Sequence, residues 1–205
     1  ARCSLPTLDG KMTEYRFTDD SYFSSVEFHE DREAADHLHQ EGHRERLEAA
    51  ASVINSTIED LFDSDSVVTI TDYGCGNGGI SDLLLHGYYV GYDICRANVE
   101  QGRALGRNVL FEDFTTKTKE EMPFSDIVIM CEVLEHMQDP HGFLEKLNCG
   151  FLIASVPNGE TPDNHPEYHV WGWDNEGFAR MLYGAGFSFA VHCSNTHGAQ
   201  IWLAY

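Results

Sequence analysis

The chain has 205 residues, the length of one globular domain, and a formal net charge of -21 at pH 7. A surface this acidic repels phosphate backbones, which disfavours nucleic-acid partners. No apolar run is long enough to cross a membrane, so no membrane span is predicted. The six cysteines are scattered without a C-x-x-C pair, which favours reduced thiols and a cytoplasmic location.

The first part of the chain predicts an arm and then a long helix. Aromatic residues are too dense here for a flexible tail, so we expect residues 1–40 to fold as an arm over the cleft, or over an edge of the core. Across Asp31–Phe62, apolar residues recur at helical spacings, which predicts a helix that packs against a sheet. We expect residues 1–205 to form a single domain whose core is 41–205.

A glycine-rich turn follows the first predicted strand, in the run of residues that begins at Val67. The strand leads through Asp72 into the turn Gly74-Cys75-Gly76-Asn77-Gly78-Gly79. Glycine tolerates positive φ and lets a ligand approach the backbone, so the turn predicts a nucleotide-type cofactor site. It can be aligned as G-x-G-x-G through Gly78, or as G-x-G-x-x-G through Gly79, which is the dinucleotide fingerprint. The turn alone leaves the cofactor open.

After this turn, strand-like and helix-like segments alternate, as a parallel sheet wound with helices requires. We predict strands at Tyr88–Tyr92, Val109–Phe111, Asp126–Cys131 and Gly150–Val156. Helices are predicted at Gly78–Leu85, Arg96–Leu105, His141–Leu147 and Asn175–Tyr183. The last two strands, Phe187–Cys193 and Ala199–Tyr205, are joined by a short turn over residues 194–198, so we expect an antiparallel pair.

Four motifs in this order resemble those of the class I S-adenosylmethionine (SAM)-dependent methyltransferases. The family's first motif, D-x-G-C-G-x-G, matches Asp72–Gly78, and its ribose-binding acidic position falls on Asp93. Its adenine-binding signature matches Glu112-Asp113-Phe114, and its E-V-L-E-H block matches residues 132–136, followed by Asp139-Pro140. The resemblance implies an α/β fold: a Rossmann-like seven-stranded, mostly parallel sheet with helices on both faces and an antiparallel C-terminal strand pair.

The resemblance also implies SAM as the cofactor and S-adenosylhomocysteine (SAH) as its product. The turn would lie against the methionine part, Asp72 would receive the ammonium group, and Asp93 would bind the ribose hydroxyls. Arg46, or Arg44 beside it, is a candidate for the cofactor carboxylate. As structural alternatives, Asp72 caps the following helix and Asp113 ends a strand. The predicted cofactor-binding residues are Asp72, Gly74, Cys75, Gly76, Gly78, Asp93, Ile94, Asp113, Phe114, Cys131 and Arg46.

The implied reaction is methyl transfer to an O or N atom, and a small-molecule acceptor is favoured over a protein or nucleic acid. His136 follows the fourth strand, where the crevice of such a sheet opens, so we predict it as general base. Glu132 would share a helical face with His136, orient the imidazole and raise its pKa. His169, in a loop of substrate-binding composition at residues 157–173, is the third catalytic candidate. Alternatively, His136 only packs against the sheet, because alignment of the reactants alone can suffice.

No metal is predicted. His165 and His169, together with Asp163 or Glu167, offer ligand atoms of the type found in some metal-dependent O-methyltransferases, but their spacing matches no strict pattern.

Two other classes of function remain alternatives. The first is an NAD(P)-binding oxidoreductase-type domain that uses Gly74, Gly76 and Gly79. The second is a non-catalytic binding subunit with the methyltransferase fold, against which the intact Asp93 and Asp113 count. The motifs distant from the turn favour the methyltransferase and the alignment through Gly78. The sequence does not indicate an oligomeric state.

Overall fold

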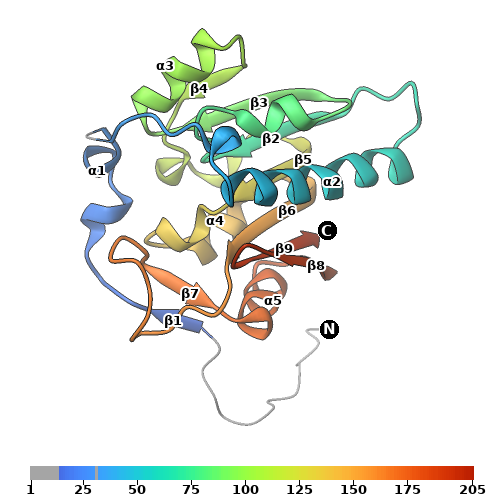
Figure 1. Ribbon diagram of the computed structural model, residues 1–205. Helices are drawn as coiled ribbons and strands as arrows, with labels where there is room; N and C mark the ends of the chain where they lie inside the picture. Colours follow the sequence, from blue (N-terminus) through green and yellow to red (C-terminus); the bar gives the residue numbers. More distant parts are fainter. Residues whose placement is uncertain (1–13, 31) are drawn as a thin grey trace.

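The computed structural model describes residues 14–30 and 32–205, so Cys3 and the start of the predicted arm lie outside the described residues. Its centre is a seven-stranded sheet with the strand order β4-β3-β2-β5-β6-β9-β8 (Figure 1). Neighbouring strands are parallel from β4 to β6, whereas β9 runs antiparallel between β6 and β8. The strands are β2 (Thr69–Tyr73), β3 (Tyr88–Asp93), β4 (Val109–Phe111), β5 (Ser125–Cys131), β6 (Cys149–Pro157), β8 (Ala190–Thr196) and β9 (Ala199–Ala204). This topology confirms the predicted fold class.

Helices cover both faces of the sheet, which explains why the central strand β5 is apolar on both sides. Ile127 and Ile129 pack in one core cluster with Ile54 of the long helix α2. Val128 and Met130, which alternate with them, pack on the other face against α4 and α5. The α-helices are α1 (Val26–Glu30), α2 (His43–Leu61), α3 (Arg96–Ala104), α4 (Pro140–Lys146) and α5 (Asn175–Gly184). Short 3-10 turns lie at Ser21–Ser24, His37–His39, Gly79–Leu83, Phe114–Thr116, Lys119–Glu121 and Leu134–His136.

Three predicted segments differ from the structure. The long helix begins at His43 and not near residue 31, because Gly42 has a positive φ of 32° and breaks the helical path. The segment expected as a helix over Gly78–Leu85 is only a 3-10 turn. The final hairpin turns in two residues, His197 and Gly198, whose φ values of 47° and 77° suit a type I′ turn, so β8 continues to Thr196.

A second sheet, of two strands, was not predicted from the sequence. β1 (Glu14–Arg16) in the arm pairs antiparallel with β7 (Trp171–Trp173), and the two lie side by side in Figure 1. The Trp173 indole donates a hydrogen bond to the Glu14 carboxylate at 2.8 Å, and the Phe17 ring stacks on His165 with centroids 3.9 Å apart. The arm and the segment before β7 therefore form one structural unit.

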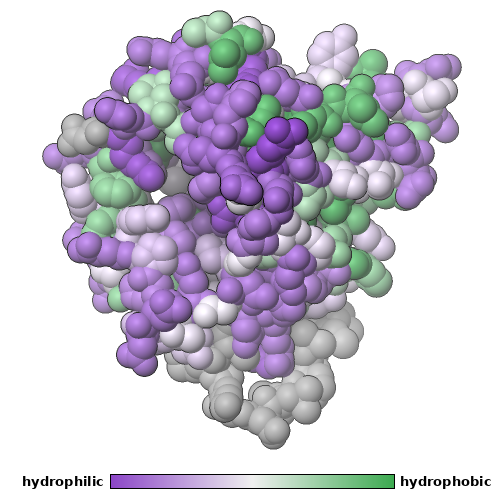
Figure 2. All heavy atoms as spheres, viewed as in Figure 1, coloured by the Kyte–Doolittle hydropathy of each residue, from purple (hydrophilic) through white to green (hydrophobic). Residues whose placement is uncertain are grey.

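Two surface properties agree with the composition. Hydrophilic residues cover most of the face shown in Figure 2, as expected from the net charge of -21. Among the described residues, no helix combines the length and the hydropathy that crossing a bilayer requires.

The cysteines that the structure describes are all free thiols: Cys75, Cys95, Cys131, Cys149 and Cys193.

Candidate active site

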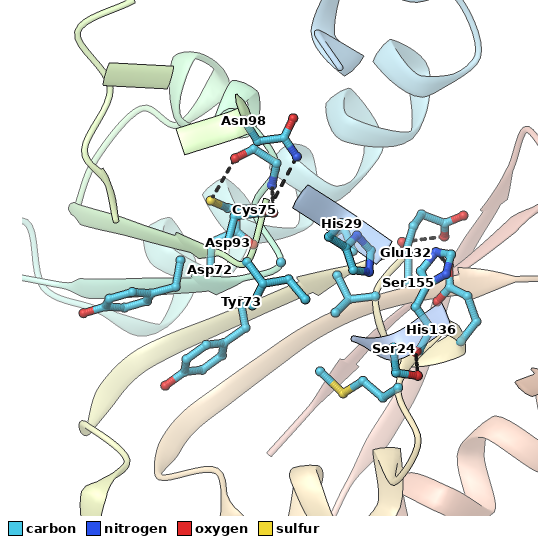
Figure 3. A pocket seen from close by; sticks show the side chains of 18 of the residues that line it. Ser24, His29, Asp72, Tyr73, Cys75, Asp93, Asn98, Glu132, His136 and Ser155 are labelled. Carbon is cyan, nitrogen blue, oxygen red and sulfur yellow. Dashed lines mark hydrogen bonds and ion pairs between the residues drawn. The ribbon is translucent and has the colours of Figure 1, made fainter. Parts of the chain in front are cut away.

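A cavity of about 1040 Å³ opens at the carboxyl ends of β2, β3 and β5. Open α/β sheets bind their ligands in a crevice at this place. Part of its wall comes from the arm, including Ser24, His29 and Arg32. Figure 3 shows Asp72, Cys75 and Asp93 on one side of the cavity and Glu132, Ser155 and His136 on the other. The predicted site residues that line it are Asp72, Gly74, Cys75, Gly76, Asp93, Ile94, Asp113, Phe114, Cys131, Arg46, Glu132, His136 and His169.

Gly78 is the predicted site residue that does not line the cavity. It precedes the 3-10 turn of Gly79–Leu83 with a φ of 74°. A Cβ at this position would lie 2.7 Å from Val109 Cγ2, so glycine is needed for packing against β4. Gly79, which the cofactor alignment through Gly78 leaves out, does line the cavity.

The glycine turn is held close to the end of β5. Gly74 and Gly76 have φ values of 71° and 58°, a region in which glycine is favoured. The backbone N–H of Gly74 donates to the carbonyl of Tyr92 on β3 at 2.8 Å. A Cβ on Gly74 would lie 2.5 Å from Val133 Cγ2, so the turn and the segment after β5 approach more closely than a side chain at Gly74 permits.

Gly74→Ala is expected to lower the free energy of unfolding by about 1–3 kcal/mol more than Gly106→Ala. Both glycines have positive φ, 71° and 81°, so both variants carry backbone strain. Only at Gly74 does the new methyl group collide with a neighbour, because nothing lies within 4 Å of a Cβ at Gly106. Urea unfolding measures the difference, and equal losses in the two variants would contradict the close approach to Val133.

Asp93 ties the glycine turn to the end of β3. The residue is 8% exposed, and burial raises the pKa of its carboxyl group. One carboxylate oxygen accepts a hydrogen bond from the Gly76 N–H at 2.7 Å, and the other accepts from the Cys95 N–H at 2.8 Å. Asp93 therefore fixes the shape of the turn in addition to lining the cavity.

Asp72 and Asp113 differ in their structural roles. Asp72 does not cap a helix, since its carboxyl group accepts a hydrogen bond from the Tyr89 hydroxyl at 2.8 Å. Burial raises the pKa of Asp72 to about 8, so this carboxyl group is mostly protonated at neutral pH. Asp113 does cap a turn, because it accepts from the Thr115 N–H at 2.9 Å while it lines the cavity.

The raised pKa of Asp72 predicts a pH-dependent stability. Its folded pKa of about 8 lies above the ordinary value of 3.8, so its contribution is complete below about pH 4 and is lost as the pH rises through 8. Between pH 5 and 8, the free energy of unfolding of the wild type should fall by at least about 1.4 kcal/mol more than that of Asp72→Asn. Urea unfolding at both pH values tests this, and parallel pH profiles would disprove the raised pKa.

Glu132, Glu135, His136 and His169 form what we call the Glu/His end of the cavity. Glu132 has a positive φ of 58°, and only residues 134–136 after it form a 3-10 turn. Its carboxylate accepts hydrogen bonds from Arg46 and from the Ser155 hydroxyl, each at 2.9 Å. The expected contact between Glu132 and His136 is therefore wrong, because the helix that would align them does not form.

The two arginine candidates are both paired with glutamates. Arg46 lines the cavity, but its guanidinium donates a hydrogen bond to the Glu132 carboxylate. The Arg46 side chain therefore belongs to the Glu/His end. Arg44 pairs with Glu48 at 2.7 Å along the helix surface.

His136 and His169 are oriented in the same manner. His136 Nδ1 lies 3.2 Å from the Tyr168 carbonyl oxygen, which can only accept, so this nitrogen carries the proton and Nε2 has the lone pair. His169 Nδ1 lies 2.8 Å from the Glu160 carboxylate, to which it donates. The two rings meet edge to face with centroids 4.8 Å apart. Burial and the neighbouring His169 lower the pKa of His136 to about 3, the opposite of the expected rise.

Glu135 and Glu160 are site residues that the sequence analysis did not single out. Glu135 is 1% exposed, and neither carboxylate oxygen has a hydrogen-bond partner among residues 14–30 and 32–205. Burial, together with the charge of Glu132, raises the pKa of Glu135 well above its ordinary value. The signal for Glu135 was its position beside His136 in the E-V-L-E-H block.

The loop histidines do not come together as the metal alternative required. His165 Nδ1 contacts the carbonyl of Pro166, and its ring lies on Phe17. Within the described part of the chain, the one group of side chains able to hold a metal ion is Glu135, His136 and His169.

Comparisons with known proteins agree with this fold. Residues 71–148 match the model of a methyltransferase-domain family, and a search of curated proteins found no match. Magnesium protoporphyrin IX methyltransferase from Synechocystis PCC 6803, solved with SAH, is 17% identical with a TM-score of 0.62, covering 90% of this chain and 96% of that chain. A SAM-dependent methyltransferase from Aquifex aeolicus is 20% identical with a TM-score of 0.55, covering 78% and 91%. The CurJ carbon methyltransferase is 13% identical with a TM-score of 0.62, covering 75% of this chain and 53% of that one.

The predicted resemblance is thereby confirmed. The matched residues include the glycine turn that begins at Gly74, and they also include Asp93 and the E-V-L-E-H block. Residues 71–148 resemble a methyltransferase domain, and the fold of the chain is that of the class I SAM-dependent methyltransferases.

Proposed function

We propose that this protein is a SAM-dependent methyltransferase that methylates an O or N atom of a small-molecule acceptor. When bound, SAM supplies a methyl group on a positively charged sulfur, which an acceptor lone pair takes while the bond electrons stay on sulfur in SAH. The observation that carries the proposal is one cavity that joins the glycine turn and Asp93 to the Glu/His end.

The residues at the glycine turn fit the cofactor. Gly74 and Gly76 present backbone without side chains, so the methionine part of the cofactor can lie against them. Asp93 is a buried carboxylate at the end of β3, where it can accept hydrogen bonds from the ribose hydroxyls. Asp72 can accept a hydrogen bond from the ammonium, whose positive charge would lower the raised pKa of this carboxyl group, and Phe114 offers an aromatic face for the adenine.

The Glu/His end then holds the acceptor. His136 and His169 each have Nδ1 fixed by an acceptor group and Nε2 with its lone pair, so both can accept a hydrogen bond from the methyl acceptor. The arm closes this end, because the Ser24 hydroxyl donates to the His136 carbonyl and the Arg32 guanidinium lies 5.7 Å from the Tyr168 ring centroid. A cavity closed by the chain's own arm favours a small acceptor. One similar structure is a methyltransferase of magnesium protoporphyrin IX, a small molecule.

A labelling experiment tests the acceptor class. Cell extract is separated into small-molecule, protein and nucleic-acid fractions, and each is incubated with the purified protein and SAM that carries an isotopic methyl group. We expect label in the small-molecule fraction, and none when heat-inactivated protein is used. Transfer only to protein or nucleic acid would refute the small-molecule acceptor, and absence of transfer to all fractions would count against the activity.

A further inference from the structure

We propose that Glu135, His136 and His169 bind a divalent transition-metal cation, of the Mn²⁺ or Zn²⁺ type, at the Glu/His end of the cavity. No strict metal-binding pattern is present in the sequence, and the candidate ligands His165 and His169 do not come together in one group. The folded chain instead brings His169 to the Glu135-His136 pair, with one ligand atom from each residue within 4.8 Å of the others.

The hydrogen bonds around the two histidines are those of metal ligands. A ligating histidine usually donates its second ring N–H to a carboxylate or a backbone carbonyl, which fixes the tautomer. His136 uses the Tyr168 carbonyl for this and His169 uses the Glu160 carboxylate. Both Nε2 atoms are therefore left as acceptors, and His136 Nε2 lies 3.7 Å from Glu135 Oε1.

The buried carboxylate of Glu135 supplies the second, independent observation. It is 1% exposed and lines the cavity, and no described residue donates a hydrogen bond to it. Burying a carboxylate without a partner is costly, and coordination to a cation removes that cost. Glu132 is not counted as a ligand, because its carboxylate is outside this group of ligand atoms and forms an ion pair with Arg46.

Two imidazoles and one carboxylate form a ligand set that suits transition-series cations and leaves coordination positions open. The open positions face the cavity, so an acceptor hydroxyl can bind the cation and lose its proton more easily. This role, which would replace His136 as the base, rests on the proposed function, whereas cation binding itself does not.

Calorimetric titration of metal-free protein with Mn²⁺, Zn²⁺ and Mg²⁺ tests the site. We expect about one equivalent of Mn²⁺ or Zn²⁺ to bind, with affinity lowered at least about 100-fold in Glu135→Gln and His169→Ala, and about 10–100-fold in Glu160→Gln, which loses only a partner of a ligand. His165→Ala should bind like the wild type. A wild type that binds neither cation, or a Glu135→Gln variant that binds as tightly, would overturn the proposal.

Two further readouts separate this proposal from misfolding and from the proposed function. Thermal unfolding should show that the cation raises the Tm of the wild type but not that of Glu135→Gln, whose metal-free Tm should be at least that of the wild type. SAH affinity is measured in the same proteins. If SAH does not bind but the cation does, the proposed function fails and the metal site stands. If SAH binds and the cation does not, the metal site is refuted and the proposed function stands.

Discussion

Asp93→Ala is expected to weaken the binding of SAM and SAH by at least about tenfold, the value of one charged hydrogen bond or more. Two effects add here. The variant loses the proposed contact with the ribose, and it also frees the Gly76 and Cys95 N–H groups that the carboxylate now holds at 2.7 and 2.8 Å. The turn against which the methionine part would lie is then no longer fixed.

Calorimetric titration with SAH measures this effect, with Asp60→Ala, an exposed position near the end of α2, as the control. The control should retain wild-type affinity. Wild-type affinity in Asp93→Ala itself would show that this residue neither binds the ribose nor shapes the site.

His136→Ala is expected to lower the methyl-transfer rate at saturating SAM by about 100-fold or more, a typical value for loss of a group that handles a proton. SAH affinity should change by less than about threefold, because His136 lies at the Glu/His end, opposite Asp93 in the cavity (Figure 3). The loss is expected whether His136 Nε2 acts alone or through a cation.

Initial rates with the acceptor found by methyl labelling give the methyl-transfer rate, and calorimetric titration gives the SAH affinity. His86→Ala, an exposed turn residue outside the cavity, is the matched control and should keep the wild-type rate. A wild-type rate for His136→Ala at every pH would eliminate His136 from catalysis.

The sheet could be predicted from the sequence because its signal is local. β5 and β6 are continuous apolar runs, as strands buried on both faces must be, and the structure places them within a residue of the predicted ranges. The four motifs lie at the ends of such strands. Since the carboxyl ends of parallel strands meet at one edge, the predicted site residues other than Gly78 share one cavity.

Contacts between distant segments could not be predicted. β1 and β7 have three residues each, too few for an alternating pattern, and they pair only because the chain returns to the arm. The direction of the Glu132 side chain depends on a positive φ of 58°, which sequence spacing does not reveal. The spacing therefore predicted a contact between Glu132 and His136, whereas in the structure Glu135 is the carboxylate that lies beside the His136 ring.

Binding of SAM at the glycine turn is tested by titrating the metal-free and the metal-loaded protein with SAM, SAH and NAD. A dinucleotide pyrophosphate binds at the N-terminus of a regular helix, but residues Gly79–Leu83 form only a 3-10 turn. We predict binding of about one equivalent of SAM or SAH and no heat from NAD. Binding of NAD without binding of SAM or SAH would show that the turn is a dinucleotide site.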